Sequence, residues 1–210
     1  MVRKDVLQGK IVSMAVFWYD TAMDNQLLET AFKWVEHPSG ESVLSADVYC
    51  STRDIFMARL DKIRGELQDE QFLHVPLFIA IIGEIGNNAY DHNLGSWRSI
   101  PGVYFGFDAA EKIAVIADRG QGVRKTLSRV RPELKSDAEA LEVAFTMQIS
   151  GRDPERRGNG LKFVRDVIQR QKWSMTFYSG VGKAIIQNGG EIKFSGGTLD
   201  MKGCICCISI

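Results

Sequence analysis

One helix with a wholly apolar beginning and a polar end constrains the fold most. Residues 77–82 read Leu-Phe-Ile-Ala-Ile-Ile and are apolar around the whole circumference of a helix, and Pro76 stands where a first helical turn tolerates proline. Glu84 and Asn88 follow, one turn apart, so their side chains share one face. Two polar side chains at the end of a buried helix need a partner, so we expect this helix to open onto a binding site.

The rest of the chain separates into helical and extended stretches. Apolar residues recur at helical spacing in residues 24–36, 51–67, 136–145 and 161–168. Short apolar runs bounded by turn residues predict strands at 103–107, 113–117, 173–178, 184–187, 191–194 and 204–210. This pattern predicts an α+β fold, a two-layer α/β sandwich with helices on one face of a mixed, mainly antiparallel sheet.

Length and charge limit the classes of function. The 210 residues, 45% of them hydrophobic, suffice for one substantial core, with room for an added subdomain. The 26 basic and 26 acidic residues balance, so no overall field favours nucleic acid or an anionic membrane. The apolar run 11–19 is too short to span a bilayer and is interpreted as a buried strand. We therefore expect a cytoplasmic protein that has neither nucleic acid nor a membrane as its partner.

Three of the four cysteines, Cys204, Cys206 and Cys207, crowd into the C-terminal run. A strand sends the first two to one face and the third to the other, whereas a metal centre needs its ligands to converge. The pattern therefore predicts free thiols in a terminal core strand, which is consistent with a reducing compartment.

Two glycine motifs accompany the Glu84–Asn88 pair. The first, at 118–122, follows a strand pattern and contains Asp118, Gly120 and Gly122. The second opens a helical pattern and consists of Gly158, Asn159, Gly160 and Leu161. Glycine lets the backbone approach a ligand closely, and a helix start favours an anion. A Glu that deprotonates a nucleophile, beside an Asn that holds hydrated Mg²⁺, is the minimum apparatus for using a nucleoside triphosphate.

Each motif also has an ordinary explanation when taken alone. The Glu–Asn pair could be an exposed polar pair, and the two glycine motifs could be simple turns. The second motif is not a Walker loop, because the Gly-Lys-Ser/Thr ending is absent. The order and spacing of the three motifs, rather than any single match, favour a nucleotide site.

In this order, E-x-x-x-N-A, D-x-G-x-G and G-x-G-L, residues 73–210 resemble the nucleotide-binding boxes of the histidine kinase-like ATPase superfamily. Gyrase, heat-shock chaperones, histidine kinases and MutL belong to this superfamily, and small anti-sigma-factor-type serine kinases are closest in size. The resemblance implies the Bergerat ATP-binding fold with ATP and Mg²⁺. It also implies Glu84 as the general base, Asn88 as the metal ligand, and Asp118 as acceptor for the adenine amine.

Further contacts are implied less uniquely. His92 either hydrogen-bonds a phosphate or caps its helix, and Asp91 stands where many sensor kinases carry Lys. Residues 123–157 form a long polar excursion, interpreted as a lid. Its arginines, of which Arg157 adjoins Gly158, are expected to bring at least one guanidinium to the γ-phosphate.

Residues 1–72 form an N-terminal extension, a strand plus helices, whose role the sequence does not assign. Its second helix is expected to pack either on the ATP-binding domain or on a second copy, which would give a homodimer through the N-terminal helices. The leading hypothesis is a Mg²⁺-dependent ATP-binding protein that transfers the γ-phosphoryl group to a partner protein in signalling. The alternatives are a nucleotide-gated binding module with slow or no turnover, and a stand-alone ATPase completed in trans.

Overall fold

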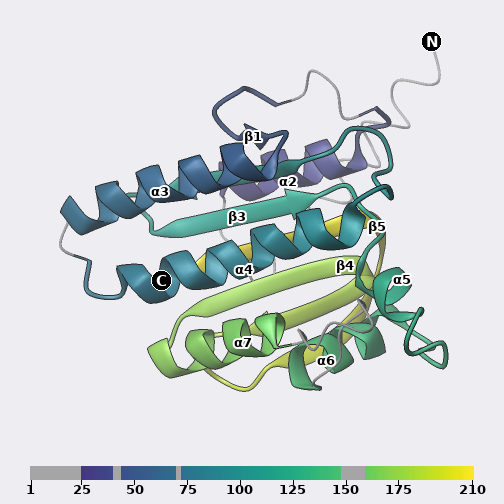
Figure 1. The fold of residues 1–210 in the computed structure, drawn as a ribbon. Coiled ribbons are helices and arrows are strands. Elements are labelled where there is room, and N and C mark those ends of the chain that lie inside the picture. Colours follow the sequence, from purple (N-terminus) through teal and green to yellow (C-terminus); the bar gives the residue numbers. More distant parts are fainter. Residues whose placement is uncertain (1–24, 40–43, 70–71, 148–158) are drawn as a thin grey trace, which may run out of the picture.

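The structure is a computed structural model that describes residues 25–39, 44–69, 72–147 and 159–210 (Figure 1). Its elements, in chain order, are α2 (Gln26–Glu36), β1 (Tyr49–Cys50), α3 (Arg53–Asp69), α4 (Val75–Asn93), β2 (Val103–Asp108), β3 (Ile113–Asp118), α5 (Val123–Leu127), α6 (Asp137–Thr146), α7 (Gly160–Gln171), β4 (Ser174–Ile186) and β5 (Lys193–Ser209). The predicted strand at 11–19 lies outside the described residues.

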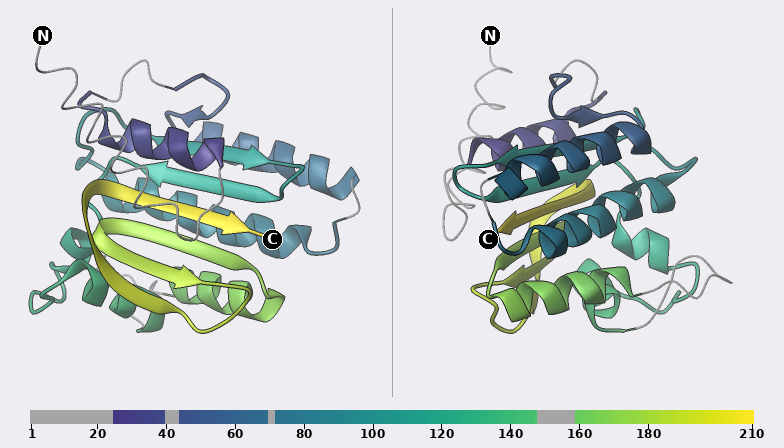
Figure 2. Two further views of the ribbon diagram at one scale, coloured as in Figure 1. Left: turned by 180° about the vertical axis from the view of Figure 1, so that it is seen from behind. Right: turned by 60° about the vertical axis from the view of Figure 1, so that its left-hand side comes forward.

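The strands form one sheet in the order β1-β2-β3-β5-β4, and each pairing between these described strands is antiparallel. Helices α3, α4, α6 and α7 cover one face of the sheet, as Figures 1 and 2 show. The predicted α+β two-layer sandwich is therefore confirmed. The parallel component that a mixed sheet would require does not occur among the described strand pairs.

The second face of the sheet also carries a helix, which corrects the expectation of helices on one face only. Figure 2 shows α2 lying across this face. Its side chains Ala31, Trp34 and Val35 are buried in a second apolar cluster with residues of the sheet. β3 explains the need for this cover, because all six of its residues are buried, so both of its faces are apolar.

The C-terminal strands are longer than predicted. The sequence pattern predicts four short strands between residues 173 and 210, but the structure has β4 with 13 residues and β5 with 17. Gly180 and Gly182 lie where the register between β4 and β5 shifts, rather than in a turn. A Cβ at Gly180 would lie 2.4 Å from the Asp137 carboxylate, and one at Gly182 would lie 2.8 Å from the Asp137 backbone. These glycines therefore let the start of α6 approach the strand.

Helix α4 is the centre of the helical layer. Phe78, Ile81 and Ile82 on its first half are fully buried, as the apolar run predicts. Gly86 admits the ring of Phe56 from α3, because a Cβ there would lie 2.1 Å from that ring. Since Phe56 belongs to the main core and β1 pairs with β2, the described part of residues 1–72 packs on the domain.

The segment interpreted as a lid is partly built into the helical layer. Ser136 caps α6 by accepting a hydrogen bond from the Glu139 N–H at 3.1 Å. Leu141 and Phe145 of α6 are fully buried in the main core. Residues 148–157 of this segment lie outside the described part of the chain. Among the described helices, none combines the length and apolar character needed to cross a membrane.

Candidate nucleotide site

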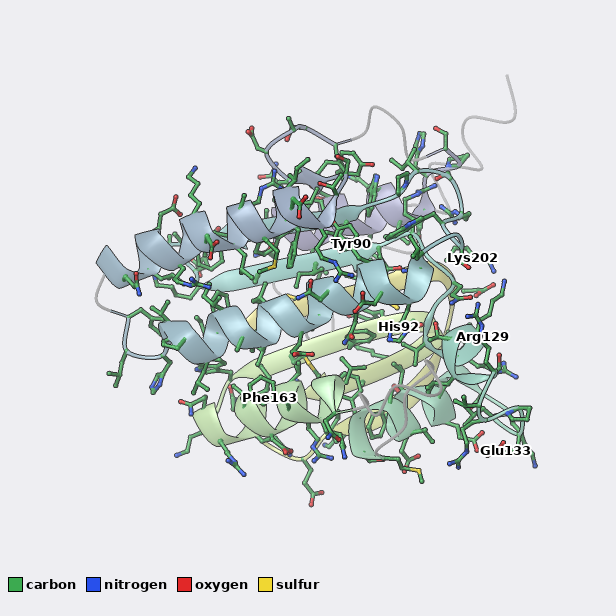
Figure 3. All side chains as sticks on the ribbon, viewed as in Figure 1. Tyr90, His92, Arg129, Glu133, Phe163 and Lys202 are labelled. Atoms are coloured by element: carbon green, nitrogen blue, oxygen red, sulfur yellow. The ribbon has the colours of Figure 1, made fainter. Side chains whose placement is uncertain are left out.

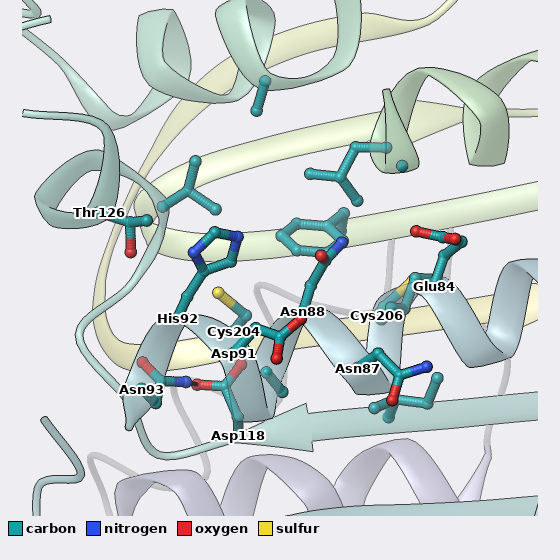
Figure 4. Close-up of a pocket in the computed structure, with 18 of the residues that line it drawn as sticks. Glu84, Asn87, Asn88, Asp91, His92, Asn93, Asp118, Thr126, Cys204 and Cys206 are labelled. Atoms are coloured by element: carbon teal, nitrogen blue, oxygen red, sulfur yellow. Dashed lines mark hydrogen bonds between the residues drawn. The ribbon is translucent and has the colours of Figure 1, made fainter. Parts of the chain in front are cut away.

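The three sequence motifs meet around one cavity of about 560 Å³ (Figure 4). Helix α4, the ends of β3 and β5, the start of α5 and the start of α7 form its walls. Eight of the predicted site residues line it: Glu84, Asn88, His92, Asp118, Gly122, Asn159, Gly160 and Leu161. Arg157 and Gly158, which are also predicted to belong to the site, lie outside the described residues.

Asp118 lies at the end of β3 and is 6% exposed. Its Oδ1 accepts hydrogen bonds from the Gly120 N–H at 2.8 Å and from Nδ2 of Asn93 at 3.1 Å. Burial raises the pKa of Asp118 to about 6, because the ionised carboxylate loses hydration, and the bonds from Gly120, Asn93 and Cys204 oppose this rise. The carboxylate is thus held in a fixed orientation as a hydrogen-bond acceptor, and it is almost completely buried.

Asn93 fixes the loop that follows Asp118. Its Oδ1 accepts from the Gln121 N–H at 3.0 Å, while its Nδ2 donates to Asp118. A Cβ at Gly120 would lie 1.9 Å from the Asn93 carboxamide, so only glycine fits here. The first glycine of the D-x-G-x-G motif therefore makes room for a side chain that orients the aspartate.

Gly122 is the N-cap residue just before α5, at the edge of the cavity, and has φ +79°, a conformation that favours glycine. Ser179 of β4 accepts a hydrogen bond from the Val123 N–H at 2.9 Å. The second glycine of the motif thus turns the chain so that α5 starts against β4.

Glu84 and Asn88 lie at the other end of the cavity, where α4 meets the start of α7. A Cβ at Gly160 would lie 2.5 Å from Oε2 of Glu84 and 3.4 Å from Nδ2 of Asn88. Asn159 precedes α7 but makes no side-chain capping hydrogen bond to it. The first N–H groups and the positive dipole end of this 12-residue helix therefore lie beside the Glu–Asn pair, an arrangement that suits an anion.

His92 lies one turn beyond Asn88, and its ring is part of the cavity wall (Figure 4). The end of α4 is tied down by another residue: the Gln121 side chain donates to the His92 carbonyl at 2.8 Å. The ring therefore lies where a ligand in the cavity would contact it.

Several residues of the site were not predicted. Asn93 follows the predicted run directly, and an amide at the polar end of a buried helix was the signal that could have revealed it. Arg53 comes from α3, far from the motifs in sequence, and no local pattern marks it. The remaining lining residues that were not named as site residues include Asn87, Asp91, Thr126, Phe177, Cys204 and Cys206.

The cysteines follow the predicted alternation. Cys204 and Cys206 line the cavity, whereas Cys207 packs on the cluster beneath α2. All four cysteines are free thiols, as predicted for the three in the C-terminal strand. Burial raises the pKa of the Cys204 and Cys206 thiols well above the usual value, so both are neutral walls of the cavity.

The cavity therefore has two chemically different ends. One presents a fixed carboxylate acceptor, and the other presents a helix start with a carboxamide and a carboxylate. In comparisons with known proteins, neither a protein-family model nor a curated protein matches this chain.

Proposed function

We propose that the chain binds ATP with Mg²⁺ in this cavity, and that its sandwich is a Bergerat-type ATP-binding fold. The observation that carries this proposal is the polarity of the cavity, with the buried Asp118 acceptor at one end and Glu84, Asn88 and the start of α7 at the other. A nucleotide has the same polarity, with a hydrogen-bonding base at one end and an anionic chain at the other. The volume of about 560 Å³ lies in the range of small-molecule sites.

Asp118 supplies the preference for adenine. A carboxylate oxygen accepts a hydrogen bond from the exocyclic amine of adenine, whereas guanine places a carbonyl there and is repelled. Because Asn93 and Gly120 fix Asp118, the carboxylate does not have to reorganise when the base enters.

The residues at the other end fit a hydrated magnesium ion with phosphates. The carboxamide oxygen of Asn88 and the carboxylate of Glu84 are hard oxygen donors, and Mg²⁺ characteristically keeps several waters and shares phosphate oxygens. Asn88 would be the direct ligand. The N–H groups at the start of α7 would donate hydrogen bonds to the phosphate oxygens.

In this proposal, Glu84 acts as the general base. Its carboxylate would accept the proton of an attacking hydroxyl while the oxygen bonds to the γ-phosphorus, and the bond from the γ-phosphorus to the bridging oxygen breaks to release ADP. With a protein hydroxyl as nucleophile, this chemistry is phosphoryl transfer to a partner in signalling. With water as nucleophile, it is ATP hydrolysis.

A calorimetric titration with ATP and GTP, on the parent and on Asp118→Asn, tests this proposal. We expect the parent to bind Mg·ATP more tightly than Mg·GTP. The variant should lose ATP affinity and lose the discrimination, because an amide can turn a donor toward the guanine carbonyl. A parent that binds neither nucleotide, or a variant with an unchanged ATP/GTP ratio, would contradict the proposal.

A further inference from the structure

The charge of the cavity poses a problem for an anionic ligand. Three of its described lining residues are carboxylates, namely Glu84, Asp91 and Asp118. Among the same described lining residues, Arg53 is the single lysine or arginine. Within the described lining, Arg53 is therefore the residue whose positive charge can, beside a metal ion, offset these carboxylates for a phosphate chain.

Arg53 is the first residue of α3 and is held at the cavity by contacts with α4. Its guanidinium forms an ion pair with Asp91 of α4. It also stacks over the ring of Tyr90, 5.9 Å from the ring centre. The Tyr90 hydroxyl lies within hydrogen-bond distance of the carbonyls of Cys50 and Thr52, at 2.7 and 2.9 Å.

These contacts fix the chain just before Arg53 onto α4. Figure 3 shows Tyr90 between α3 and α4. The side chain of Arg53 nevertheless keeps 45% of its surface exposed, and one nitrogen of its guanidinium group contacts Asp91. Because a guanidinium carries five N–H donors in a planar fork, donors remain for a second anion.

The position of Arg53 along the cavity indicates which phosphate it would meet. Its partner Asp91 lies three residues beyond Asn88 toward the Asp118 end, a rise of about 4.5 Å along the helix axis. If Asn88 holds the metal between the outer phosphates, the guanidinium lies nearer to the ribose.

We propose that Arg53 binds the phosphate group of the nucleotide that lies next to the ribose, and that Asp91 and Tyr90 position the guanidinium of Arg53. This inference rests on the proposed function. It gives the segment before residue 73 a role in the site, because the cation is delivered by α3 rather than by any of the three motifs.

The test compares adenosine, ADP and Mg·ATP by calorimetry on the parent, Arg53→Ala and Arg64→Ala. Arg64 is the matched control, because it lies on the same helix, pairs with Asp61 and has the same exposed side-chain fraction of 45%. Arg53→Ala should weaken ADP and ATP to a similar degree, about tenfold or more, and leave adenosine unchanged. Arg64→Ala should match the parent with all three ligands.

The double variant Arg53→Ala/Asp91→Asn separates direct contact from simple neutralisation. If Arg53 binds phosphate, the double variant should stay as weak as Arg53→Ala. If Arg53 only cancels the charge of Asp91, the double variant should recover the parent's ADP affinity, and the proposal is wrong.

Failure of this inference is distinguishable from failure of the proposed function. A parent that binds neither ADP nor ATP overturns both. A parent that binds them, with Arg53→Ala unchanged or with adenosine weakened as much as ADP, overturns the role of Arg53 alone.

Discussion

At the scale of single residues, Asp118 combines deep burial with the task of accepting a hydrogen bond. An ionised carboxylate only accepts, whereas a protonated one presents a donor. Since burial raises the pKa of Asp118 to about 6, the group changes between these two forms close to neutral pH. Its hydrogen-bonding character is therefore sensitive to mild acid.

This sensitivity predicts a pH dependence of adenosine binding. Adenosine lacks phosphates, so the titration of phosphate groups does not interfere. Above the pKa the carboxylate is ionised and accepts from the base, so affinity should be full; it should fall as the pH is lowered through about 6 to about 5. Calorimetry on the parent and on Asp118→Asn checks this, because the variant has no titrating group at this position. If the adenosine affinity of both proteins falls equally in acid, Asp118 does not bind the adenine base.

Asn88 gives a second prediction at this scale. Asn88→Ala should abolish the gain in ATP affinity that Mg²⁺ provides, so that affinity in Mg²⁺ falls by about tenfold or more, because the metal loses its proposed direct ligand. The measurement is an ATP titration in the presence of Mg²⁺ and again in EDTA. In EDTA the parent and the variant should bind equally weakly. A variant that keeps the parent's response to Mg²⁺ would show that another group holds the metal.

At the scale of elements, the junction between α4 and α7 decides the geometry of the end of the cavity that holds Glu84 and Asn88. Gly160 lets α7 begin against Glu84 and Asn88, and the nearest atom to an added Cβ is the flexible end of the Glu84 side chain. An added methyl group would therefore displace Glu84 more readily than it would displace the backbone. We therefore predict that Gly160 is needed for the geometry of the site and contributes little to the free energy of unfolding.

Gly160→Ala should lower ATP affinity or turnover by about tenfold while leaving the free energy of unfolding nearly unchanged. Gly65→Ala is the matched control, because it is also a helical glycine and nothing lies within 4 Å of the position that an added Cβ would take. That control should raise the free energy of unfolding by about 0.5–1 kcal/mol and leave ATP binding intact. Chemical denaturation and calorimetry on both variants distinguish the two effects, and identical behaviour would contradict the assignment.

A second junction ties β3 to α2 on the far face of the sheet. Arg119, next to Asp118, is fully buried and donates to the backbone carbonyls of Trp34, Val35, His37 and Pro38 near the end of α2. Burial and the neighbouring Arg98 lower its pKa to about 10, so the guanidinium is still charged at neutral pH. Carbonyl dipoles at the C-terminal end of a helix stabilise such a cation.

Arg119→Lys should therefore cost about 2–3 kcal/mol in the free energy of unfolding, because a lysine cannot reach several carbonyls at once. Arg98 donates to two of the same carbonyls, those of Val35 and His37, but it is exposed. Arg98→Lys should cost much less, within about 1 kcal/mol. Urea denaturation of the two variants checks the difference, and equal losses would contradict the importance of burial.

At the scale of the whole molecule, periodicity in the sequence predicts the helices and strands whose form depends on residues near one another in the chain. The apolar run before Glu84, the strand before Asp118 and the helix after Gly160 each follow from periodicity, and the structure brings them to one cavity. The glycines of β4 predict turns but lie within a strand, because a close approach of α6 leaves the same local signal as a turn.

Residues that depend on tertiary contacts were not predicted. Arg53 belongs to the site only because α3 packs on α4, and this packing depends on Phe56 fitting against Gly86. The position of α2 on the far face was missed for a related reason. Its apolar stripe predicts a buried helix face but does not say which side of the sheet receives it.

The prediction that concerns the molecule as a whole separates catalysis from nucleotide-gated binding, and it rests on Glu84. If Glu84 is the general base, Glu84→Ala should bind ATP nearly as well as the parent but lose turnover by about a hundredfold or more, because the base acts on the nucleophile rather than on the bound nucleotide. Incubation with γ-labelled ATP, alone and with cell extract, shows whether label reaches the chain itself, another protein or only free phosphate. Equal turnover in parent and variant, above background, would exclude Glu84 as the base. Tight ATP binding without turnover in the parent would favour the nucleotide-gated module, because ATP would then regulate binding of a partner without being consumed.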